Sequence, residues 1–164
     1  PDLAVRTMAK IAVEVESKRQ GFVDASYDGK YKVAAYLAKA AVKAALRLNT
    51  KAIVADSLTG MAIRALSAYR GPNVIYAQVY DPRVMRLLSL SYGAYAEHIP
   101  MDLGTGSPLQ NSVCRLIDEN KFNDDDLIVI LAGSFGPRQG VSYIEISTAA
   151  NFRQKCHGFP ALHT

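Results

Sequence analysis

The sequence predicts an α/β domain with a mostly parallel sheet whose fifth strand runs antiparallel. Short apolar runs alternate with helical segments from residue 31 onward, which is typical of βαβ units. Residues 127–132 (LIVILA) form an uninterrupted apolar run, as expected of a strand covered on both faces. The connection from Ala132 to Val141 is too short to hold a crossover helix, so the last strand should return antiparallel.

The N-terminal part predicts two helices and a linker. Residues 3–19 place apolar side chains at helical spacing, and Gly21 ends this segment as a helix C-terminal signal would. Residues 21–30 are rich in Gly, Asp and Ser and predict a linker. An alanine-rich helix follows over residues 31–48, with one apolar face that can pack close to a sheet.

The rest of the chain predicts strands and helices in alternation. The expected strands are 52–55, 74–79, 94–99, 127–132 and 142–146, and the expected helices are 62–69, 82–91 and 108–120. Asp81-Pro82 and Ser107-Pro108 each place a capping residue before a proline, which is a preferred helix start. Residues 149–164 show weak periodicity, so no structure is predicted for this tail, and the α/β domain is expected to span 31–148.

The charge distribution argues against a nucleic-acid partner. The formal net charge is +4, with ten Lys or Arg against five Asp or Glu in residues 1–51 and nine against ten in residues 52–164. The excess therefore lies on the first two predicted helices, without a basic stripe that contains aromatic residues. The sequence also shows no apolar run of membrane-spanning length and no signal peptide, so we expect no membrane partner and a cytoplasmic location.

The two cysteines, Cys114 and Cys156, stand alone in the sequence. They form no CxxC pair and have no metal-type spacing to a histidine cluster. We therefore expect reduced, intracellular cysteines rather than a disulfide. No metal site is expected either, because His98, His157 and His163 are scattered. Residues 124–126 (DDD) resemble a divalent-ion site but are interpreted as a capped turn before the 127–132 strand.

The strongest local signal is the turn after the first strand, residues 56–61 (DSLTGM). Hydroxyl side chains and a glycine lie where a strand becomes a helix, and free backbone N–H groups at a helix start suit a phosphate. Gly60 would let an anion approach the backbone closely. The alternative is a plain helix cap, in which Ser57 or Thr59 satisfies a free N–H.

The second signal is the loop after the fourth strand, residues 133–140 (GSFGPRQG). Its glycines, proline and arginine favour a shaped binding loop. The alternative is a hairpin connection that needs positive φ angles. The segment is not a nucleophile elbow around Ser134, because the leading Gly of GxSxG is absent.

Several segments together resemble the C-terminal domain of the pyruvate kinase family. These are Lys51-Ala52-Ile53-Val54, Ser57-x-Thr59-Gly60 and Arg64-Ala65-Leu66-Ser67-x-Tyr69-Arg70-x-Pro72. Residues 1–20 resemble the helix that closes the catalytic barrel of the family, and Arg86 to Gly93 resembles the segment before its third strand. The resemblance runs from about residue 1 to 147.

The resemblance implies a three-layer α/β/α domain with strand order 3-2-1-4-5 and an antiparallel fifth strand. It implies a domain that binds a regulatory sugar phosphate or nucleotide and forms one interface of a homotetramer. The parent enzyme transfers phosphate from phosphoenolpyruvate to ADP with Mg²⁺ and usually K⁺, and its catalytic residues lie on the barrel. We therefore expect no catalytic residue, cofactor or activity in this chain alone.

In an open α/β sheet of this order, ligands bind where the strand order reverses, between the first and fourth strands. The two loops singled out above leave those strands. The expected effector-binding residues are Ser57, Leu58, Thr59, Gly60, Met61, Ala62, Gly136, Arg138 and Gly140. Sugar-bisphosphate binders of the family carry Arg at position 61 and Thr or Ser at 62, so Arg138 is expected to supply the cation. The sequence leaves the effector open, and a stand-alone phosphate-binding protein of the same fold is the alternative function.

Overall fold

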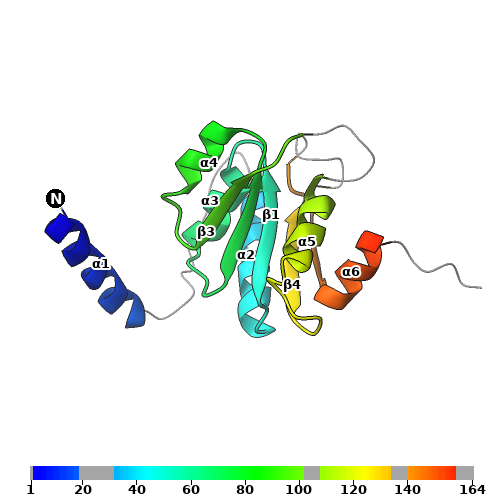
Figure 1. Ribbon diagram of the computed structural model, residues 1–164, viewed down its shortest axis with the longest axis horizontal. Coiled ribbons are helices and arrows are strands. Elements are labelled where there is room, and N and C mark those ends of the chain that lie inside the picture. The colour runs from blue at the N-terminus through cyan, green and yellow to red at the C-terminus, as the bar shows by residue number, and fades with distance from the viewer. Residues whose placement is uncertain (1, 19–31, 102–107, 134–139, 158–164) are drawn as a thin grey trace, which may run out of the picture.

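A five-stranded sheet lies between two layers of helices in the computed structural model, which describes residues 2–18, 32–101, 108–133 and 140–157 (Figure 1). The helices are α1 (Asp2–Ser17), α2 (Lys32–Arg47), α3 (Met61–Ala68), α4 (Pro82–Leu88), α5 (Pro108–Asp118) and α6 (Ala149–His157). The strands are β1 (Ala52–Ser57), β2 (Val74–Val79), β3 (Ala94–His98), β4 (Leu127–Ala132) and β5 (Tyr143–Thr148). None of the described helices is long and apolar enough to cross a membrane.

The strand order is β3-β2-β1-β4-β5, which confirms the order implied by the resemblance. β1 pairs in parallel with both β2 and β4, so Ala52 lies opposite Val74 on one side and Ile128 on the other. β4 and β5 pair antiparallel, with Leu127 opposite Thr148. The prediction from the short connection between these strands is therefore confirmed. The strand order reverses between β1 and β4, as a ligand crevice of this fold class requires.

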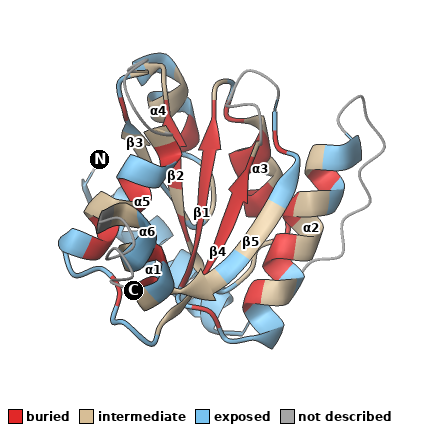
Figure 2. Ribbon diagram, turned by 90° about the vertical axis from the view of Figure 1, so that its right-hand side faces the viewer, coloured by how far each residue is buried: buried red, intermediate tan, exposed pale blue. Residues whose placement is uncertain are grey.

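Alternate side chains of the central strands fill two separate apolar layers. Ile53 and Ala55 face α2, α3 and α4, whereas Val54 faces α5 and α6. All six residues of β1 are buried, and β4 is buried except at its first residue (Figure 2). This two-sided burial explains why residues 127–132 are uniformly apolar rather than alternating.

Most predicted boundaries agree with the structure, and the differences have local causes. β2 and β4 have the predicted limits. β1 continues to Ser57, because its parallel pairing with β2 extends as far as Val79. Asp81 caps α4 as predicted, since its carboxylate accepts a hydrogen bond of 2.7 Å from the Arg83 N–H and Pro82 occupies the first turn. The cap expected at Ser107 lies outside the described residues.

The first helix forms as expected but buries none of its residues. α1 is amphipathic, and every residue from Asp2 to Ser17 is exposed. Its large apolar side chains include Leu3 at 78% and Met8 at 70% exposure. A helix of this type gains most of its stability from packing its apolar face, so α1 lacks the surface that would normally cover it. Figure 1 shows it clear of the sheet.

Helix α6 was not predicted from the sequence. Residues 149–157 have a weak amphipathic pattern, yet the helix packs against α5 and buries Ala149 and Phe152. Tertiary contacts therefore decide its structure, because local propensity alone gives little support to so short a helix.

Candidate functional site

The predicted site begins at the carboxyl end of the parallel strands. β1 ends at Ser57, residues 58–60 form a bend, and α3 starts at Met61. Ser57 is 8% exposed and Ala62 is 5% exposed, whereas Thr59 is exposed. Thr59 is therefore the hydroxyl of this turn that is best placed to meet a ligand.

Gly60 caps α3 without a side chain. Its φ of 75° lies in the left-handed region, and no side-chain hydrogen bond caps this helix start among the described residues. The alternative interpretation, in which Ser57 or Thr59 caps the helix, is therefore wrong. Gly60 is also confined by packing, because a Cβ there would lie 3.0 Å from the Val84 Cγ1 atom. The first N–H groups of α3 thus lack a side-chain partner, which keeps them available to an anion.

Arg64 brings a positive charge to this turn. Its Nη2 atom lies 3.5 Å from the Thr59 carbonyl oxygen, and the side chain is exposed. Helical side chains point back toward the N-terminus, so a residue four positions after the cap can reach over the first turn. The sequence analysis did not name Arg64, although this spacing from Gly60 could have indicated it.

The second predicted loop follows β4, which is a direct neighbour of β1 in the sheet. β1 and β4 are direct neighbours, with Ala55 opposite Leu131, so their carboxyl ends are adjacent. Gly140 has a φ of 75°, which agrees with a connection that needs positive φ angles. Gly136 and Arg138 lie outside the described residues. The contact of Arg138 with the turn at 57–62 therefore stays a prediction.

A partly buried hydrogen bond joins the carboxyl ends of β1 and β2 beside this turn. The Tyr80 hydroxyl donates to the Asp56 Oδ2 atom over 2.7 Å, and Asp56 is 6% exposed. Burial raises the pKa of the Asp56 carboxyl, and the Tyr80 hydrogen bond opposes this rise in part. Burial and the neighbouring carboxylate also raise the pKa of Tyr80, which keeps its hydroxyl a donor. The pair positions the residue that precedes Ser57.

The described residues include no group of three or more His, Cys, Asp or Glu side chains that could hold a metal ion. His98 is exposed, and the side chains of the other histidines lie outside the described part of the chain. The acidic run is a turn, as interpreted from the sequence. Its Asp126 carboxylate accepts a hydrogen bond from the Asn123 N–H over 2.8 Å, and Asp124 pairs with Arg153.

Comparison with known proteins identifies the family of this domain. The sequence pattern described as "Pyruvate kinase, alpha/beta domain" matches residues 36–147, from the first turns of α2 to β5. The chain belongs to the pyruvate kinase family. Among curated relatives, the pyruvate kinase of Borreliella burgdorferi is 29% identical over 90% of this chain, and that of Staphylococcus haemolyticus is 33% identical over 81%.

The chain is much shorter than these pyruvate kinases. It spans 32% of the Borreliella enzyme and 23% of the Staphylococcus enzyme. Two crystal structures of Cryptosporidium parvum pyruvate kinase, one of them in complex with ADP, match with TM-scores of 0.61 and 0.62 at 22% identity. They cover 71% and 77% of this chain, and the chain covers 23% and 25% of theirs. This likeness supports the fold.

Cys114 lies within the pyruvate kinase match and Cys156 lies beyond it, and together they contradict the sequence-based expectation. Cys114 on α5 and Cys156 on α6 form a disulfide, so the prediction of two reduced cysteines is wrong. The family match ends at residue 147, before α6 begins. Spacing could not reveal the pair, because the cysteines are 42 residues apart and meet only when α6 packs on α5.

Proposed function

We propose that this chain is the regulatory and subunit-contact part of a pyruvate kinase and binds a phosphorylated effector. The observation that carries the effector proposal is the start of α3, where Gly60 leaves the first N–H groups without a side-chain cap. The helix dipole is positive there, and Arg64 adds a charge at the same turn. This turn also lies where the strand order reverses, between β1 and β4, and its position supports the proposal independently.

The parent reaction is phosphoryl transfer from phosphoenolpyruvate to ADP, which gives pyruvate and ATP. We assign that reaction, with Mg²⁺ and K⁺, to a catalytic barrel outside this chain, because the chain spans only 32% and 23% of the two curated pyruvate kinases. The exposed apolar face of α1 supports this assignment, since a barrel would cover it. The isolated chain should show no turnover in a coupled assay, and activity of the pure chain would contradict the assignment. We propose the cytoplasm as its location.

Effector binding should depend on Arg138. We expect the Arg138→Ala variant to bind a sugar phosphate or AMP at least about tenfold more weakly than the wild type, because a charge-assisted contact with phosphate contributes roughly 1.5–3 kcal/mol. Arg64→Ala should also weaken binding. Isothermal titration calorimetry with each ligand measures the Kd values.

The matched control is Arg47→Ala, which removes the same charge from the end of α2, near the amino end of β1 and away from the turn at 57–62. It should bind like the wild type. Equal affinity in the Arg138 and Arg47 variants would remove Arg138 from the site. Absence of heat with every phosphorylated ligand would contradict the effector proposal.

The second part of the proposal is self-association through β5. β5 is the last strand of the sheet, and Tyr143 and Ile146 are 37% and 38% exposed. An edge strand presents unpaired backbone groups that a second copy can match by two-fold symmetry. We therefore propose that this edge contributes to a homotetramer of the parent enzyme.

Sedimentation velocity over a range of concentrations tests this interface. We expect Ile146→Lys to shift the chain toward monomer, because a charge on an edge strand opposes pairing. Tyr95→Lys, on the opposite edge strand β3, should leave association unchanged. A wild-type chain that stays monomeric at the highest concentration would count against the interface.

The alternative is a stand-alone phosphate-binding protein with the same fold. The exposed apolar face of α1 does not favour it. The coding sequence upstream of Pro1 distinguishes the two, because a preceding barrel would support the pyruvate kinase assignment.

A further inference from the structure

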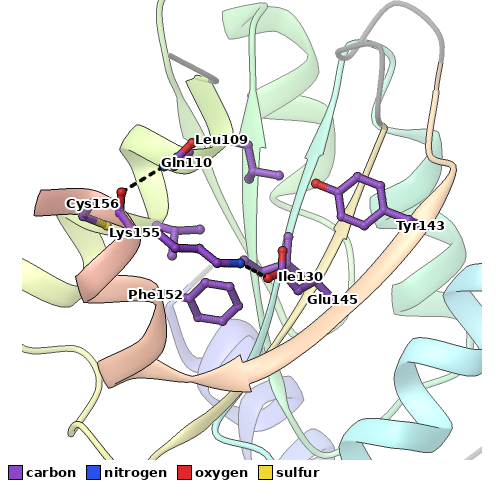
Figure 3. Close-up of a pocket in the computed structure, with 9 residues that line it drawn as sticks. Leu109, Gln110, Ile130, Tyr143, Glu145, Phe152, Lys155 and Cys156 are labelled. Carbon is purple, nitrogen blue, oxygen red and sulfur yellow. Dashed lines mark hydrogen bonds and ion pairs between the residues drawn. The ribbon is translucent and has the colours of Figure 1, made fainter. Parts of the chain in front are cut away.

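Helix α6 is held to the domain by two different sets of contacts. It follows β5 and lies beside α5 on the face of the sheet opposite α2 (Figure 2). Between α5, α6 and the strands β4 and β5 lies a cavity of about 170 Å³. Leu109 and Ile130 form part of its apolar lining, and Tyr143, Lys155 and Cys156 line it as well (Figure 3).

The first half of α6 is anchored by buried and backbone contacts. Ala149 is fully buried and Phe152 is 4% exposed. The backbone N–H of Ala149 donates to the Asp126 carbonyl over 2.9 Å, and that of Ala150 donates to the Asp124 carbonyl over 3.0 Å. None of these contacts involves a cysteine.

The second half of α6 relies on the disulfide. Its polar side-chain contacts in the described part of the chain are an ion pair of Arg153 with Asp124, a 3.3 Å hydrogen bond from Gln110 Nε2 to the Lys155 carbonyl, and an ion pair of Lys155 with Glu145. All three lie largely at the surface, where such contacts contribute little to stability. The bond from Cys156 to Cys114 is the covalent link between this turn and α5. Both cysteines are partly exposed, so a reductant can reach the bond.

We propose that the Cys114–Cys156 disulfide is a redox-controlled latch on the last turn of α6. A thiolate of a dithiol reductant attacks one sulfur and forms a mixed disulfide, and its second thiol then displaces the protein sulfur. Two electrons pass to the protein, Cys114 and Cys156 become thiols, and the reductant becomes a disulfide. The turn from Arg153 to Cys156 then loses its covalent tie, while Ala149 and Phe152 stay anchored. The cavity then loses the part of its lining that Lys155 and Cys156 form.

Hydrogen–deuterium exchange of the full chain, oxidised and after treatment with dithiothreitol, tests the latch. We expect the amides of residues 153–156 to exchange at least about tenfold faster after reduction, because the disulfide no longer restrains local opening of this turn. Residues 149–152 and α5 should exchange as before when the labelling time is too short for global unfolding to contribute. Trypsin provides a second readout, since it should cleave after Arg153 and Lys155 faster in the reduced chain.

Two variants separate the disulfide from the polar contacts. Cys114→Ser/Cys156→Ser should behave like the reduced wild type and should not respond to dithiothreitol. Lys155→Ala removes the ion pair with Glu145 and the cation–π contact with Phe152 but keeps the disulfide, and its last turn should stay protected when oxidised. Equal exchange and cleavage in the oxidised and reduced wild type would overturn the latch and leave a purely structural cross-link. Faster exchange spread over β4 and β5 at labelling times too short for global unfolding would also overturn it, since the release would not be local.

Discussion

Replacing Leu66 by alanine should lower the free energy of unfolding by about 2–5 kcal/mol. Leu66 is fully buried where α3 packs against the sheet, in the same apolar cluster as Val42 of α2 and Ile63. Truncation removes buried methyl groups and leaves a cavity that the surrounding helices can fill only in part. The free energy of unfolding of a small domain is only about 5–15 kcal/mol, so this loss is a large share of the stability.

Chemical denaturation followed by circular dichroism measures this effect. Leu90→Ala is the matched control, since Leu90 is 93% exposed and the same atoms are removed. The control should change the free energy of unfolding by no more than about 0.5 kcal/mol. Similar losses in the two variants would show that α3 does not pack as described.

Removing the disulfide should also lower stability, by about 2–4 kcal/mol relative to the oxidised chain. The bond joins residues 42 positions apart and therefore restricts the unfolded chain strongly. The variant is Cys114→Ser/Cys156→Ser, and the measurement is the denaturation midpoint without reductant.

The wild type in dithiothreitol is the control for this prediction. It should lose nearly the same free energy, and the double variant should not respond to the reductant. Identical denaturation of the oxidised wild type and the double variant would show that the bond contributes no net stability. This measurement reports global unfolding, whereas exchange and proteolysis report the local release of α6.

The central elements could be predicted from the sequence because their signals are local. The apolar run at 127–132 requires burial on both sides, and the structure supplies helices on both sides. Asp81-Pro82 starts a helix because the cap and the first turn involve adjacent residues. The antiparallel direction of β5 also follows from a short connection. The candidate turn at 56–61 was found in the same way, from residue types at a strand-to-helix junction.

Of the two site features that the sequence analysis missed, one depends on segments distant in the chain and the other is local. The hydrogen bond of Tyr80 with Asp56 forms because β1 and β2 are neighbours in the sheet. Arg64 is one turn into α3, and its place beside Thr59 depends on the left-handed cap at Gly60. A search for side chains that point back over a helix start would have found Arg64.

The sequence by itself determined the alternation of strands and helices and the antiparallel last strand, and it predicted the turn that we propose binds a phosphate. Each depends on periodicity or on residue types within a few positions. Only the tertiary structure decided that α6 forms and that Cys114 bonds to Cys156. The physical reason is that a short helix of weak amphipathicity is stabilised by its packing on α5, and a disulfide needs its two Cβ atoms within bonding reach. No local sequence pattern indicates that α6 packs on α5 or that the two cysteines come within bonding distance.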